Sequence, residues 1–219
     1  MPHGALRVRL TMRVSTHEAP ELRRLGVMGG TFDPIHVGHL IAASEALNTF
    51  DLDRVMFVPT GRPWQKSAYS DAEDRYLMTV LGAATNPRFA VSRIELDRRG
   101  PTYTSDTLQA LRSFHGTGVT MFFIIGADAV LRLGTWNRVE ELADLASVIA
   151  VTRPGFDLGR LNPEPWWPEV LPLEMPGIDV SSSDIRDRVR KGSPIDYLVP
   201  AQVGEYISEH GLYVGSDGV

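Results

Sequence analysis

The sequence predicts an α/β protein built on a doubly wound, mostly parallel sheet. Apolar runs of strand length alternate with segments of helical periodicity along most of the 219 residues. Residues 121–125 are apolar throughout, as is typical of a central parallel strand that is buried on both faces. Such a sheet has right-handed crossovers and binds its ligands beyond the carboxyl ends of its strands.

The first half of the predicted sheet lies between residues 25 and 96. Leu25, Val27 and Met28 form a short apolar strand, which a glycine turn connects to a helix at residues 40–47. The elements expected next are a strand at 54–58, a helix from Asp71 to Leu81 and an alternating strand at 89–96.

The second half continues this alternation. Its expected elements are a helix from Thr104, the central strand, helical segments at 127–133 and 138–145, and a fifth strand at 148–151. Residues 156–177 carry five prolines and two tryptophans, which indicates an irregular surface connection. Hydroxyl caps at 180–186 open a further helix, and a last helix at 201–209 ends before Gly211.

Composition limits the classes of function. The net charge of −5 argues against a broad nucleic-acid-binding surface. No apolar run approaches the roughly 20 residues that cross a bilayer. Because the chain has no cysteine, disulfides, thiolate catalysis and cysteine-based zinc sites are excluded, which fits a cytoplasmic protein. The sequence leaves open whether the chain forms a homo-oligomer.

The most informative segment is GGTFDPIHVGH at residues 29–39, between the first strand and the first helix. Gly29 and Gly30 allow a tight turn and a close approach to a ligand. His36 and His39, three residues apart, share one face of the first helical turn. The free backbone N–H groups of that turn form an anion site. The segment therefore predicts a place that holds phosphate groups.

Other uses of the two histidines have to be weighed against phosphate binding. Taken alone, the pair could as well cap the helix or pack in the core. A metal site is disfavoured because the chain has no cysteine and no third histidine lies nearby. Neither the Walker Gly-Lys-Ser/Thr nor Gly-x-Gly-x-x-Gly is present. Imidazole N–H groups that donate to a phosphoryl transition state remain the best use of the pair.

The segment 29–39 resembles the signature of the nucleotidyltransferase superfamily with a His-x-Gly-His motif. Other segments are similar, in order and spacing, to bacterial nicotinate-nucleotide adenylyltransferases. They are GPTYTSDTL at 100–108, FIIGAD at 123–128, Trp136, RPG at 153–155, VSSSDIR at 180–186, Tyr206-Ile207 and GLY at 211–213. The likeness covers about residues 25–214 and implies a Rossmann-like nucleotidyltransferase fold with a small C-terminal helical subdomain.

This resemblance implies adenylyl transfer from ATP to nicotinate mononucleotide, which yields deamido-NAD and pyrophosphate in NAD biosynthesis. The mononucleotide phosphate is already anionic, so catalysis rests on positioning and charge stabilisation. Mg²⁺ is the implied cofactor, held by substrate phosphates and water with no protein ligand. The implied partners are these small molecules, without nucleic acid or membrane.

The resemblance also implies an ATP site with His36, His39 and Arg186 as its catalytic residues. The implied ATP-binding residues are Gly29, Gly30, Thr31, Phe32, His36, His39, Lys66, Gly126, Asp128, Arg153, Ser182, Ser183 and Arg186. The planar fork of Arg186 suits the β- and γ-phosphates, and Asp128 suits the ribose hydroxyl groups. Helix capping is the alternative for the two serines and Asp128, and a strand-end cap is the alternative for Arg153.

For the mononucleotide, the resemblance implies contacts from Tyr103, Thr104, Arg132 and Trp136. Trp136 would stack on the pyridine ring, with a core position as the alternative. Backbone N–H groups of Tyr103 and Thr104 would receive the nicotinate carboxylate. They would favour the acid because a carboxylate only accepts hydrogen bonds, whereas a carboxamide also presents a donor.

The chain departs from the family pattern at three kinds of position. The loop RPWQK at 62–66 has Gln65 where the family often has histidine, although Lys66 can still reach phosphate. Arg132 stands where tyrosine is common and bears on how the pyridine pocket closes. Thr102 stands where the family usually has serine, and Ser183 stands where it usually has threonine. Both replacements keep the hydroxyl group.

Four segments are expected from this sequence. They are a basic disordered extension at 1–24, a nucleotide-binding α/β domain at 25–179, a helical subdomain completing the ATP site at 180–214, and a loose tail at 215–219. For the extension, a targeting arm is the alternative. For the function, the alternatives are a sibling transferase (pantetheine-phosphate adenylyltransferase or a cytidylyltransferase) and a non-catalytic nucleotide-binding regulatory module.

Overall fold

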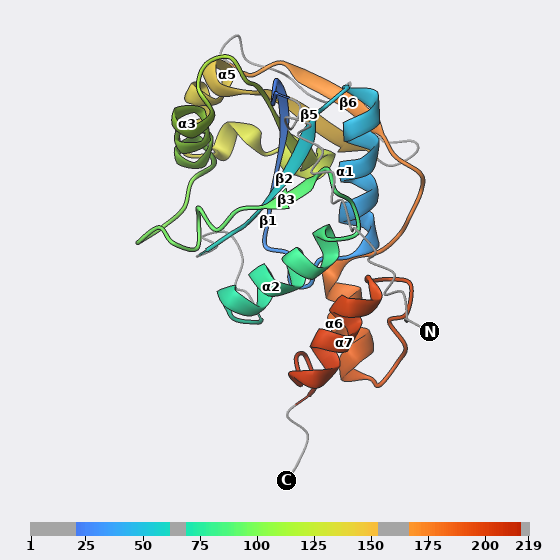
Figure 1. The fold of residues 1–219 in the computed structure, drawn as a ribbon. Helices are drawn as coiled ribbons and strands as arrows, with labels where there is room; N and C mark the ends of the chain where they lie inside the picture. Colours follow the sequence, from blue (N-terminus) through green and yellow to red (C-terminus); the bar gives the residue numbers. More distant parts are fainter. Residues whose placement is uncertain (1–20, 62–68, 153–166, 216–219) are drawn as a thin grey trace, which may run out of the picture.

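Six parallel strands form one twisted sheet in the order β3-β2-β1-β4-β5-β6 (Figure 1). The computed structural model describes residues 21–61, 69–152 and 167–215. The strands are β1 (Arg24–Gly30), β2 (Arg54–Pro59), β3 (Phe89–Val91), β4 (Thr120–Gly126), β5 (Ser147–Thr152) and β6 (Val170–Glu174). The predicted doubly wound parallel sheet is confirmed, and its strand order reverses between β1 and β4.

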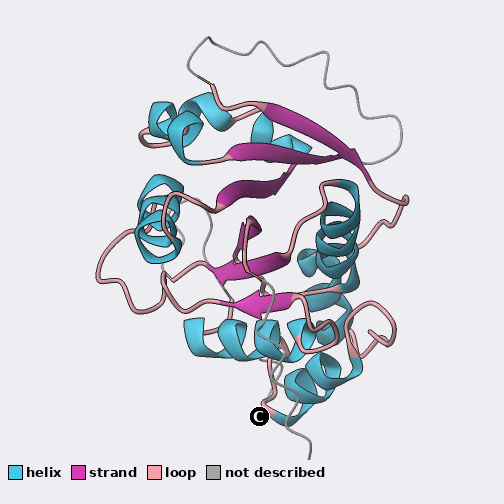
Figure 2. Cartoon of the chain, turned by 45° about the horizontal axis from the view of Figure 1, so that its top comes forward, coloured by secondary structure: helices cyan, strands magenta, loops and turns pink. Residues whose placement is uncertain are grey.

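Helices cover both faces of this sheet. They are α1 (Val37–Thr49), α2 (Ala72–Ala83), α3 (Thr104–His115), α4 (Ala127–Val130), α5 (Leu142–Leu145), α6 (Ser182–Arg190) and α7 (Ala201–Glu209), with 3₁₀ turns η1 (Leu133–Thr135) and η2 (Val139–Glu141). Figure 1 shows α3 and α5 on one side of the strands and α1 on the other, with α6 and α7 below the lower end of α1. Figure 2 shows the strands as a layer between helices. No helix of the described ranges has the length and apolar character to span a bilayer.

The two faces carry two separate hydrophobic clusters. In β4, Phe122 and Ile124 face α1 and α2, whereas Met121, Phe123 and Ile125 face α3 and α5. This explains why the run is apolar throughout, as the sequence analysis expects of a central strand.

The C-terminal helices belong to the first of these clusters. Ile185 of α6 and Val203 and Ile207 of α7 are buried in the same apolar cluster as the inner face of α1. Burial of apolar side chains against the sheet therefore fixes α6 close to the start of α1.

Three predicted elements differ from the structure, one because it ends early and two because they are divided. The strand predicted at 89–96 ends at Val91, because the chain turns and Asp97 N–H donates to the Arg93 carbonyl (3.0 Å). The segment predicted at 127–133 splits into α4 and η1. The segment predicted at 138–145 splits into η2 and α5, and Arg138 before η2 has a left-handed φ of 53°.

The prediction of an irregular connection through 156–177 is wrong at residues 170–174. These residues form β6, which pairs in parallel with β5. Pro172 is tolerated there because β6 is an edge strand, where a missing N–H breaks no ladder on the open side. The rest of that prediction up to residue 166 lies outside the described residues.

Candidate active site

A cavity of about 520 Å³ opens at the carboxyl edge of the sheet, where the strand order reverses. The ends of β1, β2 and β4 and the starts of α1, α3 and α4 contribute to its wall. The volume is typical of a site for a small molecule or cofactor. The cavity lies beyond the strand ends, where the sequence analysis expects the ligands to bind.

His36 and His39 lie in this wall as a stacked pair. Their ring centroids are 3.7 Å apart at an interplanar angle of 27°. His36 is the N-cap residue of α1, and its backbone N–H donates to His39 Nδ1 (3.3 Å). Because Nδ1 accepts this bond, the proton of a neutral His39 ring resides on Nε2. That N–H is then a donor for an anionic ligand.

The environment of His39 keeps its ring uncharged at neutral pH. Burial, followed by repulsion from His36, holds the pKa of His39 well below its ordinary value of 6.5. A neutral imidazole still donates through Nε2–H, and the negative charge of a bound polyphosphate would act to raise this pKa.

Packing behind the pair fixes the orientation of both rings. Phe32, which is 2% exposed, meets His39 edge-on at 5.0 Å between ring centroids and Phe57 at 5.7 Å. A Cβ atom on Gly38 would lie 3.1 Å from the His36 ring and 3.0 Å from Val180. Glycine between the histidines therefore lets the His36 ring lie against the start of α1.

The start of α6 is joined to the loop that precedes His36. Arg186 Nη1 donates to the Asp33 carbonyl (2.6 Å), and Ser182 Oγ donates to the Pro34 carbonyl (2.9 Å). Arg186 also donates to Ser183 Oγ (3.1 Å), and its guanidinium lies 4.1 Å from the centre of the Tyr69 ring. Two hydrogen bonds and a ring contact thus hold a cation beside the histidine loop.

The opposite end of the cavity is formed by the first turn of α3 and the segment after η1. Thr102, Tyr103 and Thr104 line it, and Tyr103 is the N-cap residue of α3. The backbone N–H groups of such a turn suit a negatively charged group. Trp136 lines the same end and meets Phe123 edge-on at 6.0 Å between ring centroids.

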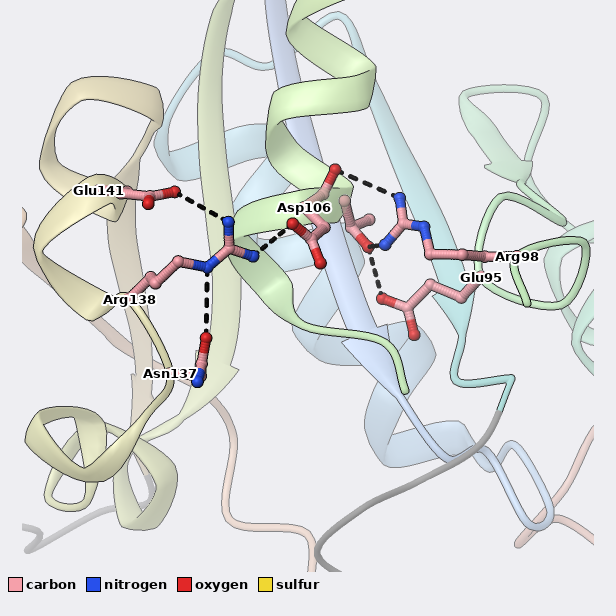
Figure 3. Close-up of polar contacts among 7 residues, drawn as sticks. Glu95, Arg98, Asp106, Asn137, Arg138 and Glu141 are labelled. Carbon is pink, nitrogen blue, oxygen red and sulfur yellow. Dashed lines mark hydrogen bonds and ion pairs between the residues drawn. The ribbon is translucent and has the colours of Figure 1, made fainter. Parts of the chain in front are cut away.

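A buried carboxyl group braces this turn from within. Glu95 is 8% exposed and accepts a hydrogen bond from Thr107 Oγ1 (2.8 Å) (Figure 3). Arg98 donates to the same hydroxyl oxygen (3.3 Å) and to the Asp106 carbonyl (3.2 Å). Burial raises the pKa of Glu95, and hydrogen bonds from Thr107 and Thr102 oppose the rise.

Arg138 connects the Trp136 segment to the same helix. Its guanidinium pairs with the Asp106 carboxylate and lies 3.6 Å from Glu141 (Figure 3). Asp106 is in the first turn of α3, and Arg138 follows Trp136 by two residues. The two walls of this end are therefore held to each other.

Comparison with known proteins identifies the family to which this chain belongs. Residues 27–188 match the cytidylyltransferase-like family. A probable nicotinate-nucleotide adenylyltransferase of Leifsonia xyli subsp. xyli is 57% identical over 87% of this chain and 94% of its own length. Another from Acidothermus cellulolyticus is 53% identical over 89% of this chain and 96% of its own length. The chain belongs to the nicotinate-nucleotide adenylyltransferase family.

Solved structures of this family share the fold. The Plasmodium falciparum nicotinic acid mononucleotide adenylyltransferase complexed with NaAD matches with a TM-score of 0.72 and 21% identity, covering 87% of this chain and 97% of that one. The identity to the two bacterial relatives confirms the resemblance stated from the sequence. The sibling transferases considered as alternatives are not the family of this chain.

The cavity brings together most of the site residues that the sequence predicts. Those that line it are Gly29, Gly30, Thr31, His36, His39, Tyr103, Thr104, Gly126, Asp128, Arg132 and Trp136. Phe32 lies beneath the wall, and Ser182, Ser183 and Arg186 lie beside it, bonded to the histidine loop or to one another. Lys66 and Arg153 lie outside the described residues.

Sequence reasoning missed several residues of the wall and its support. Thr60, Glu95, Thr102 and Thr107 line the cavity without having been assigned a role. Thr102 and Thr107 stand in the segment at 100–108 that resembles the family, which was a usable signal. No sequence signal pointed to Glu95, because it falls inside the strand predicted at 89–96. In the described ranges, no group of three or more histidine, aspartate or glutamate side chains could hold a metal ion.

The lowered pKa of His39 predicts a pH-dependent stability. The unfolded chain takes up a proton near pH 6.5 and the folded site does not, so acidification favours unfolding. We expect the ligand-free protein to lose on the order of 1 kcal/mol per pH unit below that value through this group. Urea unfolding at pH 7.5 and 5.5 measures the loss, which should be smaller in His39→Asn. Equal losses in both proteins would contradict the assignment.

Proposed function

We propose that this chain transfers the adenylyl group of ATP to nicotinate mononucleotide, giving nicotinate adenine dinucleotide and pyrophosphate. In this reaction the mononucleotide phosphate oxygen bonds to the α-phosphorus of ATP, and the bond from that phosphorus to the pyrophosphate oxygen breaks. The observation that carries the proposal is the stacked histidine pair in the cavity at the start of α1. Family membership identifies the two substrates.

The histidine end of the cavity suits the triphosphate. His39 offers Nε2–H, and the start of α1 adds the N–H group of Gly38 and the positive end of the helix dipole, whereas the Val37 and His39 N–H groups already donate to the Leu198 and His36 carbonyls. These donors stabilise charge that grows on the phosphate oxygens in the transition state. Arg186 beside the loop provides a planar cation for the outer phosphates. Asp128, exposed at the wall, suits ribose hydroxyl groups.

The opposite end suits the nicotinate ring. The flat face of Trp136 provides a stacking surface, and the N–H groups at the start of α3 suit the ring carboxylate. Arg132 lines the same cavity and adds positive charge toward an acidic substrate. These features together favour nicotinate over nicotinamide.

Mg²⁺ accompanies ATP in this proposal. The phosphate end of the wall presents imidazole and backbone N–H donors, which bind phosphate oxygens and do not coordinate a hard cation. The ion is therefore held by the triphosphate and water, where it supplies neutralisation of phosphate charge. The protein residues orient the two substrates and donate hydrogen bonds.

A pyrophosphate-release assay across mononucleotides tests the proposed function. We expect turnover with ATP and nicotinate mononucleotide, weaker turnover with nicotinamide mononucleotide and none with phosphopantetheine. ATP binding without pyrophosphate release from any mononucleotide would favour the non-catalytic nucleotide-binding module instead.

Loss of the His39 imidazole should impair the chemical step. We expect His39→Ala to lower kcat by about 10²-fold or more, the scale of a lost transition-state donor. His210→Ala is the matched control, since that exposed ring stacks on Tyr206 of α7 and lies outside the cavity. Circular dichroism checks the fold, and wild-type turnover in His39→Ala would refute the mechanism.

Trp136 should contribute to the binding of the mononucleotide and not to the binding of ATP. We expect Trp136→Ala to raise the KM for nicotinate mononucleotide by about tenfold, the order of a lost aromatic contact, and to leave the KM for ATP nearly unchanged. Trp136→Phe keeps a flat face and should recover much of the loss. Steady-state kinetics with each substrate varied in turn measures both KM values. A rise in the KM for ATP alone would disprove the stacking assignment.

A further inference from the structure

Arg75, in the first turn of α2, is buried beneath the cavity wall. Its side chain is 1% exposed. By volume, it is the largest of the described side chains that are fully buried. Its hydrogen bonds within the described part of the chain go to backbone carbonyl groups and none goes to a carboxylate. A buried cation without a bonded carboxylate partner is costly, because hydrogen bonds to neutral carbonyls offset only part of its lost hydration.

The guanidinium joins the two loops that leave the neighbouring strands β1 and β2. Nη1 donates to the carbonyls of Thr31 (2.9 Å) and Thr60 (2.7 Å), and Nη2 donates to the carbonyl of Gly61 (3.2 Å). Thr60 N–H in turn donates to the Gly30 carbonyl (2.9 Å). Thr31 and Thr60 both line the cavity, so the bonds fix wall residues from behind.

We propose that Arg75 is a positioning residue for the triphosphate of ATP, through the two strand ends that it holds. In a trans peptide the C=O and N–H groups point in opposite directions. A Thr31 carbonyl held by Arg75 therefore turns the next N–H group, that of Phe32, away from the guanidinium. The proposal rests on the assignment of the histidine end of the cavity to the phosphates.

The charge of Arg75, as well as the shape of its guanidinium, contributes to the binding of the triphosphate. Arginine keeps its positive charge at neutral pH, even though burial lowers its pKa. Its partners are neutral carbonyls, so the positive charge stays behind the wall with partial compensation from Asp33 and Asp71. A fixed cation in a low-dielectric interior attracts phosphate more strongly than one in water.

Arg112 of α3 provides a matched control at the other edge of the sheet. Its guanidinium also bonds two backbone carbonyls, those of Val119 (2.5 Å) and Leu145 (2.8 Å). These residues precede β4 and β5, so Arg112 braces the amino ends of strands as Arg75 braces the carboxyl ends. It does not line the cavity. A purely structural role for such an arginine would make the two positions behave alike.

The test compares lysine and glutamine substitutions at both arginines. Arg75→Lys keeps the charge but replaces the planar fork with a compact ammonium group, and Arg75→Gln removes the charge. We expect the calorimetric Kd for ATP to rise roughly tenfold or more in Arg75→Lys, and further in Arg75→Gln. The KM for nicotinate mononucleotide should stay within about twofold. The Arg112 variants should lower the Tm but keep the Kd for ATP within about twofold.

Three outcomes would overturn the proposal. The first is a folded Arg75→Lys protein that binds ATP as wild type does. The second is an equal rise of the ATP Kd and the mononucleotide KM, and the third is an equal loss of ATP binding in the Arg112 variants. If Arg75→Gln does not fold, Arg75→Lys decides. A wild-type protein that binds ATP without releasing pyrophosphate refutes the proposed function, while the Kd comparison still tests Arg75.

Discussion

The site depends on the hydrogen bonds that hold Asp33 in the turn between β1 and α1. Its carboxylate, in a residue 3% exposed, accepts from Tyr69 N–H (2.6 Å), Ser70 Oγ (2.6 Å) and the Tyr213 hydroxyl (2.6 Å). Its carbonyl accepts from Arg186. Burial and Asp33 raise the pKa of Tyr213, so that its hydroxyl stays a donor. Asp33 thus ties the histidine turn to the residues before α2 and to Tyr213 through its carboxylate, and to α6 through its carbonyl.

Positive groups are concentrated at this turn although the chain as a whole carries a net charge of −5. Arg75 lies behind the turn, Arg186 lies beside it, and the positive end of the α1 dipole lies in the cavity wall. His39 adds a donor without adding a charge in the ligand-free state. Local preorganisation can therefore bind a polyanion without a basic surface.

Short-range patterns determine what the sequence can predict here. Strand β4 and the turn before α1 are predicted correctly because their apolar run and their glycines and histidines act locally. Strand β6 is missed because Pro172 signals a loop, and only its edge position makes proline acceptable. The support by Arg75 cannot be read from a helix pattern, since Thr31, Thr60 and Gly61 reach it from two separate loops. Such roles depend on which loops the topology brings together.

Glu95 raises a question of charge, because a carboxyl group lines a cavity proposed to take an acidic ring. Its Oε1 already accepts from Thr107, and Arg98 lies on the far side of that hydroxyl. Burial also raises its pKa, which reduces the cost of placing a second carboxylate in the same cavity. An acceptor engaged in this way offers less to the N–H₂ of a carboxamide, while the start of α3 still offers donors to a carboxylate. The hydrogen bonds that brace the start of α3 are thus compatible with the preference for the acid that we propose.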